Sequence, residues 1–158
     1  MMCREVRRMG CKFEHIGILV KNRELAVTSL QQMPGADEAV YVDKMNFDET
    51  CVQVGAPFAI KGANITVGGV EYEIIEVVPE ESRGSYMMNR LAEYGEGLHH
   101  IAFEYDDLEE FNEAAESLIR QGYIVGHKAS IPFMGKTAHV YYLDCPFGGL
   151  TYEIKCMV

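Results

Sequence analysis

The chain has 158 residues, enough for one compact domain or two small fused modules. Hydrophobic residues make up 48% of it and charged residues 24%, a globular balance that excludes intrinsic disorder and fibrous repeats. The 24 acidic residues outnumber the 14 basic ones and give a formal net charge of −10. Nucleic acid and anionic membrane surfaces are therefore disfavoured partners, because the summed field repels phosphate.

The N-terminal segment shows no targeting or transmembrane pattern. No apolar run approaches the roughly 20 residues that span a bilayer, and the basic residues at the start of MMCREVRRMGCKFEH have no apolar stretch behind them. We therefore expect a cytoplasmic protein in which residues 1–12 form an N-terminal extension, with residues 1–8 preceding the true start at Met9. Five scattered cysteines without a CxxC pair indicate reduced structural thiols.

Residues 13–78 read as a first β-α-β-β-β module. Strands are predicted over 13–20, 38–42, 59–67 and 70–78, and a helix over 22–33. Asn22 can cap this helix and Pro34-Gly35 ends it, while Gly68-Gly69 is a two-residue hairpin signal between the last two strands.

Residues 98–158 repeat that order after a linker over 79–97, which holds a short helix from about Ser85 to Tyr94. Strands are predicted over 98–105, 123–128, 137–143 and 150–156. The helix between the first two begins at Asp106 or Asp107 and stops at Gly122. The sequence thus predicts an α+β fold of two βαβββ modules.

The internal repeat also aligns chemistry. His15 begins the first strand of one module and Glu73 lies in its last strand, while His100 and Glu153 hold the same places in the other module. A single histidine or glutamate in a strand is more often a packed or solvated residue than a ligand. Four that coincide under one repeat form an N2O2 set for a divalent metal, with positions left open for water or substrate.

Other histidines fit this pattern less well. His99 and His100 should point to opposite faces of a strand, and the repeat selects His100 because both it and His15 precede an isoleucine. His127 and His139 fall outside the repeat, so surface or pocket-wall positions are expected for them. No Ser/His/Asp order, P-loop or GxGxxG is present, which leaves nucleophilic and nucleotide-phosphate chemistry without a basis.

A family resemblance rests on these same residues. The segments His15-Ile-Gly-Ile-Leu-Val, Tyr72-Glu73-Ile-Ile, Gly97-Leu-His-His100-Ile-Ala-Phe and Thr151-Tyr-Glu153-Ile resemble the vicinal oxygen chelate superfamily, which includes glyoxalase I, methylmalonyl-CoA epimerase, extradiol dioxygenases and bleomycin-resistance proteins. The resemblance spans about residues 12–156 and implies a curled sheet around a metal cleft, with His15, Glu73, His100 and Glu153 as ligands. The stretch from Tyr86 to Phe103 looks most similar to the epimerase branch.

This branch implies proton transfer next to a carbonyl or thioester, with Glu153 close to the mobile proton and a second base at Asp48 or Glu49, of which we take Glu49. The implied cofactor is one divalent ion, Zn, Co, Ni or Mn; Glu73 argues against a redox iron site. The implied partner is a small molecule such as an acyl-CoA thioester, with Lys61, Arg83, Arg90, Lys128 and Lys136 available for phosphate, and a homodimer is expected. A hemithioacetal lyase of the glyoxalase I type and a metal-free binding protein of the bleomycin-resistance type remain the alternatives.

Overall fold

The computed structural model describes residues 10–158, so the expected start-site extension lies outside the described residues. The first half contains β1 (Cys11–Val20), α1 (Arg23–Gln31), β2 (Val40–Phe47), β3 (Val52–Val54), β4 (Phe58–Val67) and β5 (Val70–Val77). A 3-10 turn, η1 (Pro79–Glu81), and α2 (Tyr86–Tyr94) follow. The second half contains β6 (Gly97–Tyr105), α3 (Leu108–Arg120), β7 (Ile124–Phe133), β8 (Lys136–Asp144) and β9 (Thr151–Met157).

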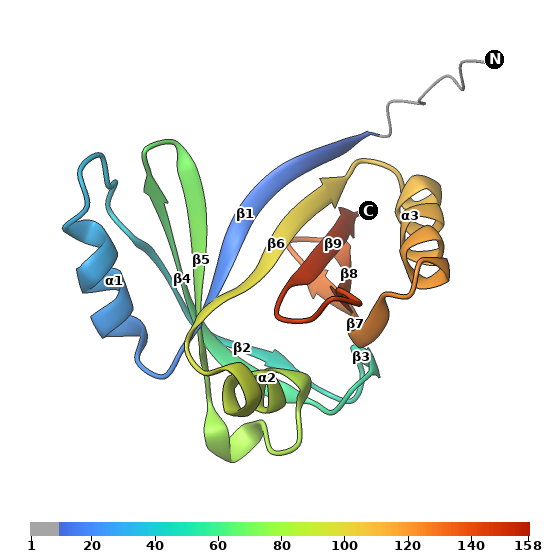
Figure 1. Cartoon of the computed structure of the whole chain (residues 1–158), viewed down its shortest axis with the longest axis horizontal. Coiled ribbons are helices and arrows are strands. Elements are labelled where there is room, and N and C mark those ends of the chain that lie inside the picture. The colour runs from blue at the N-terminus through green and yellow to red at the C-terminus, as the bar shows by residue number, and fades with distance from the viewer. Residues whose placement is uncertain (1–9) are drawn as a thin grey trace.

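All these strands belong to one mixed sheet, in the order β2-β4-β5-β1-β6-β9-β8-β7-β3 (Figure 1). The two edge strands, β2 and β3, are consecutive in the chain and are joined by residues 48–51. A short connection between opposite edges requires the sheet to curl until its edges approach each other. The predicted α+β fold with a curled sheet is therefore confirmed.

Both halves of the sheet repeat one pairing pattern. β1 runs parallel to β5, and β6 runs parallel to β9, so the first and last strands of each half are neighbours. The antiparallel pair β1–β6 joins the halves at the centre of the sheet. The two modules consequently pair with each other within one chain, and all four predicted metal ligands lie on the four central strands.

Three apolar cores follow from the curl. One fills the concave side and draws residues from both halves, including Leu19, Phe58, Ile75, Val140 and Tyr142. Helix α1 covers a second core on the outer face of the first half, and α3 covers a third on the outer face of the second half. Helix α2 adds Tyr86 and Met87 to the concave core, which places it at one end of the curl (Figure 1).

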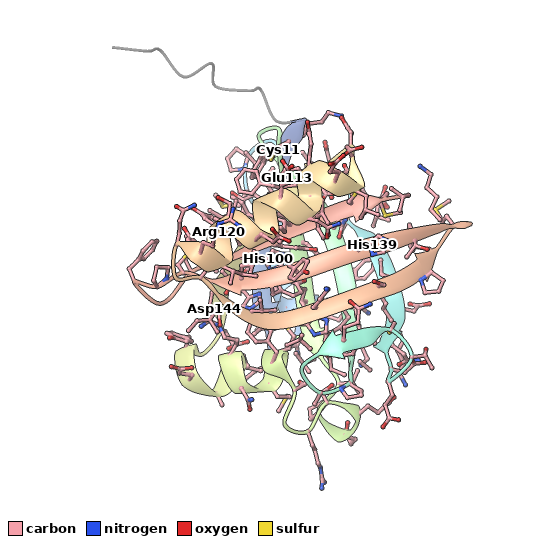
Figure 2. All side chains as sticks on the ribbon, turned by 90° about the vertical axis from the view of Figure 1, so that its right-hand side faces the viewer. Cys11, His100, Glu113, Arg120, His139 and Asp144 are labelled. Atoms are coloured by element: carbon pink, nitrogen blue, oxygen red, sulfur yellow. The ribbon has the colours of Figure 1, made fainter. Side chains whose placement is uncertain are left out.

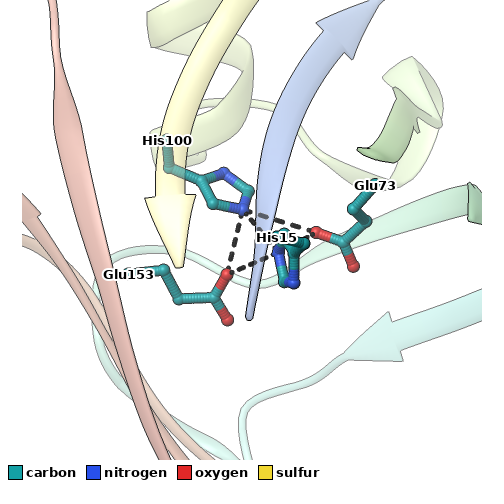
Figure 3. A group of neighbouring side chains, drawn as sticks. All are labelled: His15, Glu73, His100 and Glu153. Atoms are coloured by element: carbon teal, nitrogen blue, oxygen red, sulfur yellow. Dashed lines mark hydrogen bonds and ion pairs between the residues drawn. The ribbon is translucent and has the colours of Figure 1, made fainter. Parts of the chain in front are cut away.

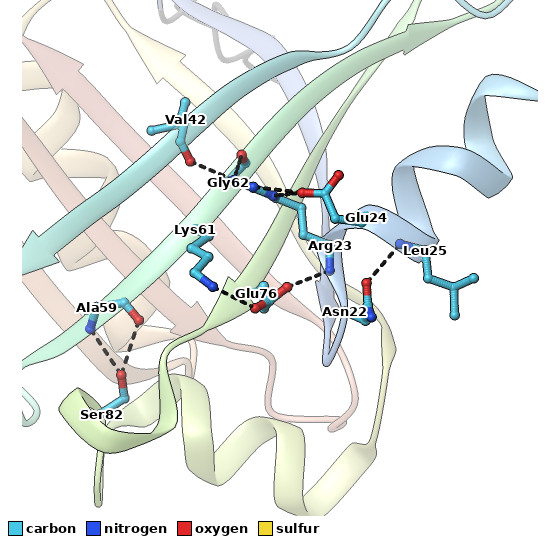
Figure 4. Close-up of polar contacts among 10 residues, drawn as sticks. All are labelled: Asn22, Arg23, Glu24, Leu25, Val42, Ala59, Lys61, Gly62, Glu76 and Ser82. Atoms are coloured by element: carbon cyan, nitrogen blue, oxygen red, sulfur yellow. Dashed lines mark hydrogen bonds and ion pairs between the residues drawn. The ribbon is translucent and has the colours of Figure 1, made fainter.

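Helix α1 is fixed to the first half by polar contacts (Figure 4). Asn22 caps the helix as predicted, since its side-chain oxygen accepts a hydrogen bond from the backbone N–H of Leu25 at 2.9 Å. The backbone N–H of Arg23 donates to Glu76 on β5 at 2.7 Å, and its guanidinium donates to the carbonyls of Val42 and Gly62. Asp107, one of the two residues predicted to begin the helix of the second half, caps α3, and Ser85, where the linker helix was predicted to begin, caps α2.

The strand boundaries differ from the prediction in the segment between β2 and β4. β2 covers Val40–Phe47 where a strand over 38–42 was predicted, and the short strand β3 was not predicted at all. β3 has only three residues, too few to show a hydrophobic period, and it forms by pairing with β7 across the sheet. β1 also begins earlier than expected, at Cys11, inside the predicted extension.

Within residues 10–158, no helix has the length and apolar character needed to cross a bilayer.

Candidate metal centre

The four repeat-matched residues meet at one point on the concave side of the sheet (Figure 3). One ligand atom from each of His15, Glu73, His100 and Glu153 lies within 4.8 Å of the others. His15, His100 and Glu153 are buried, whereas the side chain of Glu73 keeps 27% of its surface exposed. The cluster is therefore enclosed on three sides and reaches solvent on the side of Glu73.

Strand period and two bulges place these side chains on one face. Glu73 shares the face of Ile75 and Val77 on β5, which contribute to the concave core. The pairing of β1 with β6 shifts between Phe13 and Ile16, and again between Gly17 and Ile18. Such bulges re-aim a side chain without breaking a strand. They turn His15 and His100 toward each other, with ring centroids 5.2 Å apart.

Gly17 makes room for the ring of His100. It pairs with His100 across the β1–β6 ladder, and a Cβ atom at this position would lie 1.9 Å from Cε1 of that ring. No real Cβ contact is that short, so any other residue at position 17 would displace the imidazole. Gly17 belongs to the first repeat, and its lack of a side chain leaves the space that the imidazole of His100 in the second repeat occupies.

The distances between donor atoms suit one shared cation. Nε2 of His15 lies 3.0 Å from Nε2 of His100, and the contacts of these two nitrogens with the carboxylates of Glu73 and Glu153 range from 2.9 to 3.4 Å. Metal–ligand bonds of about 2.1 Å at right angles would put neighbouring donor atoms about 3 Å apart. Moreover, Oε2 of Glu153 is buried and accepts no well-formed hydrogen bond. The four residues therefore fit a divalent ion.

Electrostatics favours a positive charge at this point. Burial alone would lower the pKa of His15, but close contacts with the carboxylates of Glu14, Glu153 and Glu73 override it and raise that pKa to about 12. Burial likewise opposes ionisation of Glu73, yet its contacts with His100 and His15 lower the pKa to about 2. The pKa of His100 is raised and that of Glu153 is lowered by the same mutual contacts. Two ionised carboxylates thus hold positive charge between them.

Each histidine is also contacted on its far nitrogen. Nδ1 of His15 lies 3.5 Å from Oε2 of Glu14, whose carboxylate pairs with Lys155 on β9. Nδ1 of His100 lies 2.8 Å from Nδ1 of His99. Such contacts fix the tautomer and orientation of a metal-binding imidazole. The sequence analysis missed both roles, although the acidic residue next to His15 and the His-His pair were available as signals.

His99 does not behave as strand alternation predicts. The bulge in β6 brings its ring beside that of His100 rather than to the opposite face, with centroids 5.1 Å apart. The choice of His100 for the cluster nevertheless agrees with the structure, because His99 is not one of the four converging residues. The internal repeat therefore selected the correct residue, whereas the expectation that the two rings point to opposite faces was wrong because of the bulge.

Aromatic rings line the concave side next to the cluster. The ring of Tyr142 lies 5.1 Å from that of His100 and 5.8 Å from that of His127, measured between centroids. Tyr86 stacks on Tyr142, and its hydroxyl donates a hydrogen bond to Asp144. His127 was expected at a surface or pocket wall, but it is completely buried in this lining.

The other predicted residues lie away from the four. Glu49 is exposed in the turn between β2 and β3 and is not part of the cluster. His139 lies on β8 and its Nδ1 contacts the hydroxyl of Ser130 at 3.0 Å; Figure 2 shows it on the face of the sheet near α3. Among the proposed phosphate contacts, Lys61 pairs with Glu76 and Lys128 lies against the ring of Tyr141, beside a pocket under α3.

Comparison with known proteins agrees with this arrangement. Residues 14–142 match the family model of the Glyoxalase/Bleomycin resistance protein/Dioxygenase superfamily. The chain belongs to this superfamily. Its members typically bind a metal ion, and the matched range includes three of the four converging residues, His15, Glu73 and His100. No curated protein sequence matches the chain significantly.

Solved structures of the superfamily share the fold at low identity. Methylmalonyl-CoA epimerase from Mycobacterium tuberculosis superposes with a TM-score of 0.58 at 16% identity, covering 100% of this chain and 93% of that one. A variant of the Streptomyces coelicolor epimerase in complex with 2-nitronate-propionyl-CoA gives 0.53 at 23% identity, covering 92% and 96%. A variant of 4-hydroxymandelate synthase from Streptomyces coelicolor gives 0.56 at 14%, covering 94% of this chain and 49% of that one. At these identities the likeness establishes the fold only. The epimerases and the 4-hydroxymandelate synthase use this fold for different reactions.

Proposed function

We propose that this protein is a metal-dependent enzyme that moves a proton on the carbon next to a carbonyl or thioester group. The observation that carries the proposal is the convergence of His15, Glu73, His100 and Glu153, with donor atoms at the spacing of ligands around one ion. A divalent ion held there would supply a Lewis acid that polarises a substrate carbonyl and stabilises the charge left when a proton departs.

The chain's own residues would divide the remaining work. The buried carboxylate of Glu153 lies at the closed side of the cluster, and its contacts with His100 and His15 lower its pKa, so it is ionised at neutral pH as a metal ligand must be. It is also our candidate for the base next to the mobile proton. Glu73 occupies the more exposed side, where substrate would approach. The apolar lining from Leu19, Phe58 and Val140 excludes water from the reacting carbon. Glu49 remains our candidate for a second base.

The alternatives differ in what they require of the cluster. A metal-free binding protein has no need of four converging donors, and a ring-cleaving iron dioxygenase uses two histidines and one carboxylate. The second carboxylate therefore supports redox-neutral chemistry. The epimerase structures include complexes with methylmalonyl-CoA and a propionyl-CoA analogue, and this supports acyl-CoA thioesters as the first substrate class to test. A glyoxalase-type lyase would act instead on hemithioacetals.

The decisive experiment is a solvent-exchange assay. Metal-reconstituted protein is incubated in D2O with acyl-CoA thioesters or hemithioacetals, and deuterium incorporation is followed by mass spectrometry. We expect about one divalent ion per chain and exchange that disappears with a chelator. Glu153→Gln should abolish exchange, whereas His139→Ala, outside the cluster, should preserve it. Protein that binds no divalent ion, or exchange that persists after chelation, would refute the proposal.

A further inference from the structure

A second pocket lies on the outer face of the sheet, away from the metal centre. It has a volume of about 260 Å³ and is bounded by the start of α3, by β3 and by the outer side of the β7–β8 pair. Ala129 on β7 and Val140 on β8 belong to the concave core. Strand alternation consequently directs their neighbours Lys128, Ser130 and His139 to the outer face, which Figure 2 views. The sheet therefore separates this pocket from the four converging donors.

The polar lining of this pocket is rich in hydrogen-bond donors. Within residues 10–158, no acidic side chain lines it, although the chain as a whole carries a net charge of −10. The lining includes the ammonium group of Lys128, the ring of His139 and the side-chain amides of Gln53 and Asn112. A concave surface with a cation, several donors and no carboxylate favours an anion.

Lys128 supplies the positive charge of this pocket. Among residues 10–158 its ammonium group pairs with no carboxylate and lies instead over the ring of Tyr141, 4.8 Å from the ring centroid. Other lysines of the same chain do pair with carboxylates, among them Lys12, Lys61 and Lys155. The side chain of Lys128 is half-buried, so its charge is partly desolvated without a counter-ion. An anion in the pocket would provide that counter-ion.

Hydrogen bonds orient a second donor. Nε2 of Gln53 donates to Oγ of Ser130 at 2.8 Å, and this oxygen lies 3.0 Å from Nδ1 of His139. No other acceptor among the described side chains contacts Ser130, so its proton points to Nδ1 and leaves the proton of an uncharged imidazole on Nε2. An imidazolium ring carries a proton on Nε2 as well. This nitrogen is therefore a donor in either charge state.

The apolar part of the lining limits the size of an occupant. Leu108 and Phe111 of α3 line the pocket together with Tyr141, and the rings of Phe111 and Tyr141 lie 5.5 Å apart. The volume is below the range of about 300–1,000 Å³ that is usual for drug-sized ligands. The pocket thus suits a small molecule with one charged end and one apolar end, and is too small for a CoA thioester.

We propose that this pocket is an accessory binding site for a small organic monocarboxylate. The carboxylate would pair with Lys128 and accept a hydrogen bond from Nε2 of His139, while the apolar end contacts Leu108 and Phe111. A carboxylate carries one charge, which the single cation of the pocket matches, whereas a phosphate dianion would keep an unpaired charge. The site is independent of the proposed proton transfer because it lies across the sheet from the metal centre, so changes in it should leave solvent exchange unaltered.

NMR titration of the full chain with benzoate tests the site, and benzamide serves as an uncharged analogue of the same shape. We expect a Kd of about 1 mM for benzoate and binding about tenfold weaker for benzamide. Lys128→Met, which removes the charge and keeps a side chain of similar length, should weaken benzoate binding by about tenfold or more. Lys136→Met is the matched control, because it removes the same charge from β8 outside the pocket and should not change the affinity. Ser130→Ala releases the ring of His139 and should weaken binding by about threefold.

The amide shifts caused by benzoate should fall on β7, β8 and the first turns of α3. Shifts centred on the strands that carry the four converging donors, or an affinity unchanged in Lys128→Met, would place benzoate elsewhere and overturn the site. Equal affinities for benzoate and benzamide, no binding of benzoate at about 10 mM, or tighter binding of inorganic phosphate than of benzoate would overturn it as well. The titration requires neither metal nor turnover, so failure of this site and failure of the proposed function are distinguishable.

Discussion

The two halves of the chain contribute the same pair of donors, but each half surrounds its pair differently. In the first half, Glu73 keeps 27% of its side-chain surface exposed and His15 is contacted by the carboxylate of Glu14. In the second half, the side chain of Glu153 is only 8% exposed and His100 is contacted by another imidazole, that of His99. The first half thus presents the open, charged side of the site, and the second half presents the closed side.

Contacts that cross between the halves account for this difference. Lys155 of the second half holds the carboxylate of Glu14, and Gly17 of the first half accommodates the ring of His100. Each donor set consequently depends on residues supplied by the other repeat. Duplication of one module explains why each half supplies a histidine and a glutamate. The residues around the two pairs differ, because one pair lies on the open side of the cleft and the other on its closed side. We expect the buried half to dominate metal retention.

The largest expected effect is the loss of a donor from the closed side. His100→Ala removes a completely buried member of the cluster and leaves Glu153 with one imidazole contact fewer. We expect metal content to fall from about one ion per chain to none, with solvent exchange lost. Elemental analysis after dialysis measures the metal content, and the D2O assay measures solvent exchange. His139→Ala removes a histidine of the same half from outside the cluster and should change neither. Full metal content in His100→Ala would contradict the assignment.

A smaller effect should come from Gly17→Ala, which tests the dependence of the second half on the first. The added methyl group would overlap the ring of His100 and push it from its position. We expect metal affinity to fall by about 10–100-fold, as for changes that disorient a ligand, with about 1–3 kcal/mol of stability lost to overpacking. Gly62→Ala on β4 is the matched control, because its Cβ would meet Val42 at an ordinary 3.5 Å. Equal affinities in the two variants would show that Gly17 does not position His100.

Much of this site could be predicted from the sequence, because the four residues that form it occur at equivalent positions of an internal repeat. The repeat identified His15, Glu73, His100 and Glu153, and the parallel pairing of first and last strands in each half brings those positions together. What could not be predicted depends on pairing between distant segments. The bulges in the β1–β6 pair arise from registers that no local pattern encodes, and β3 exists only because β7 is available to it.

The pH dependence of metal-free protein should report on the whole cluster, because the pKa values of His15 and His100 are raised and those of Glu73 and Glu153 are lowered. The pKa of His15 is raised from 6.5 to about 12, so its protonated form stabilises the fold fully below pH 6.5, and this contribution is lost as the pH rises toward 12. Glu73, with a pKa lowered from 4.5 to about 2, contributes above pH 4.5 and loses this as the pH falls toward 2. A bound divalent ion would take the place of the protons at alkaline pH. Thermal unfolding at several pH values should therefore show an alkaline loss of stability only without metal; identical curves would contradict a shared cation site.

The smallest effects should come from the helix caps, which occupy equivalent places in the two halves. Asn22 accepts from Leu25 N–H at the start of α1, and Asp107 accepts from Glu110 N–H at the start of α3. Replacing either by alanine should cost about 1 kcal/mol. The cost should be higher for Asp107→Ala, because this change also removes a negative charge from the N-terminal end of the helix dipole, whereas Asn22 is neutral. Urea unfolding of the two variants measures the difference.

Metal content should stay unchanged in both cap variants, because α1 and α3 cover the outer faces of the sheet and neither helix contributes a donor. Loss of metal in one variant alone would mean that the helix of that half sets the geometry of its strands.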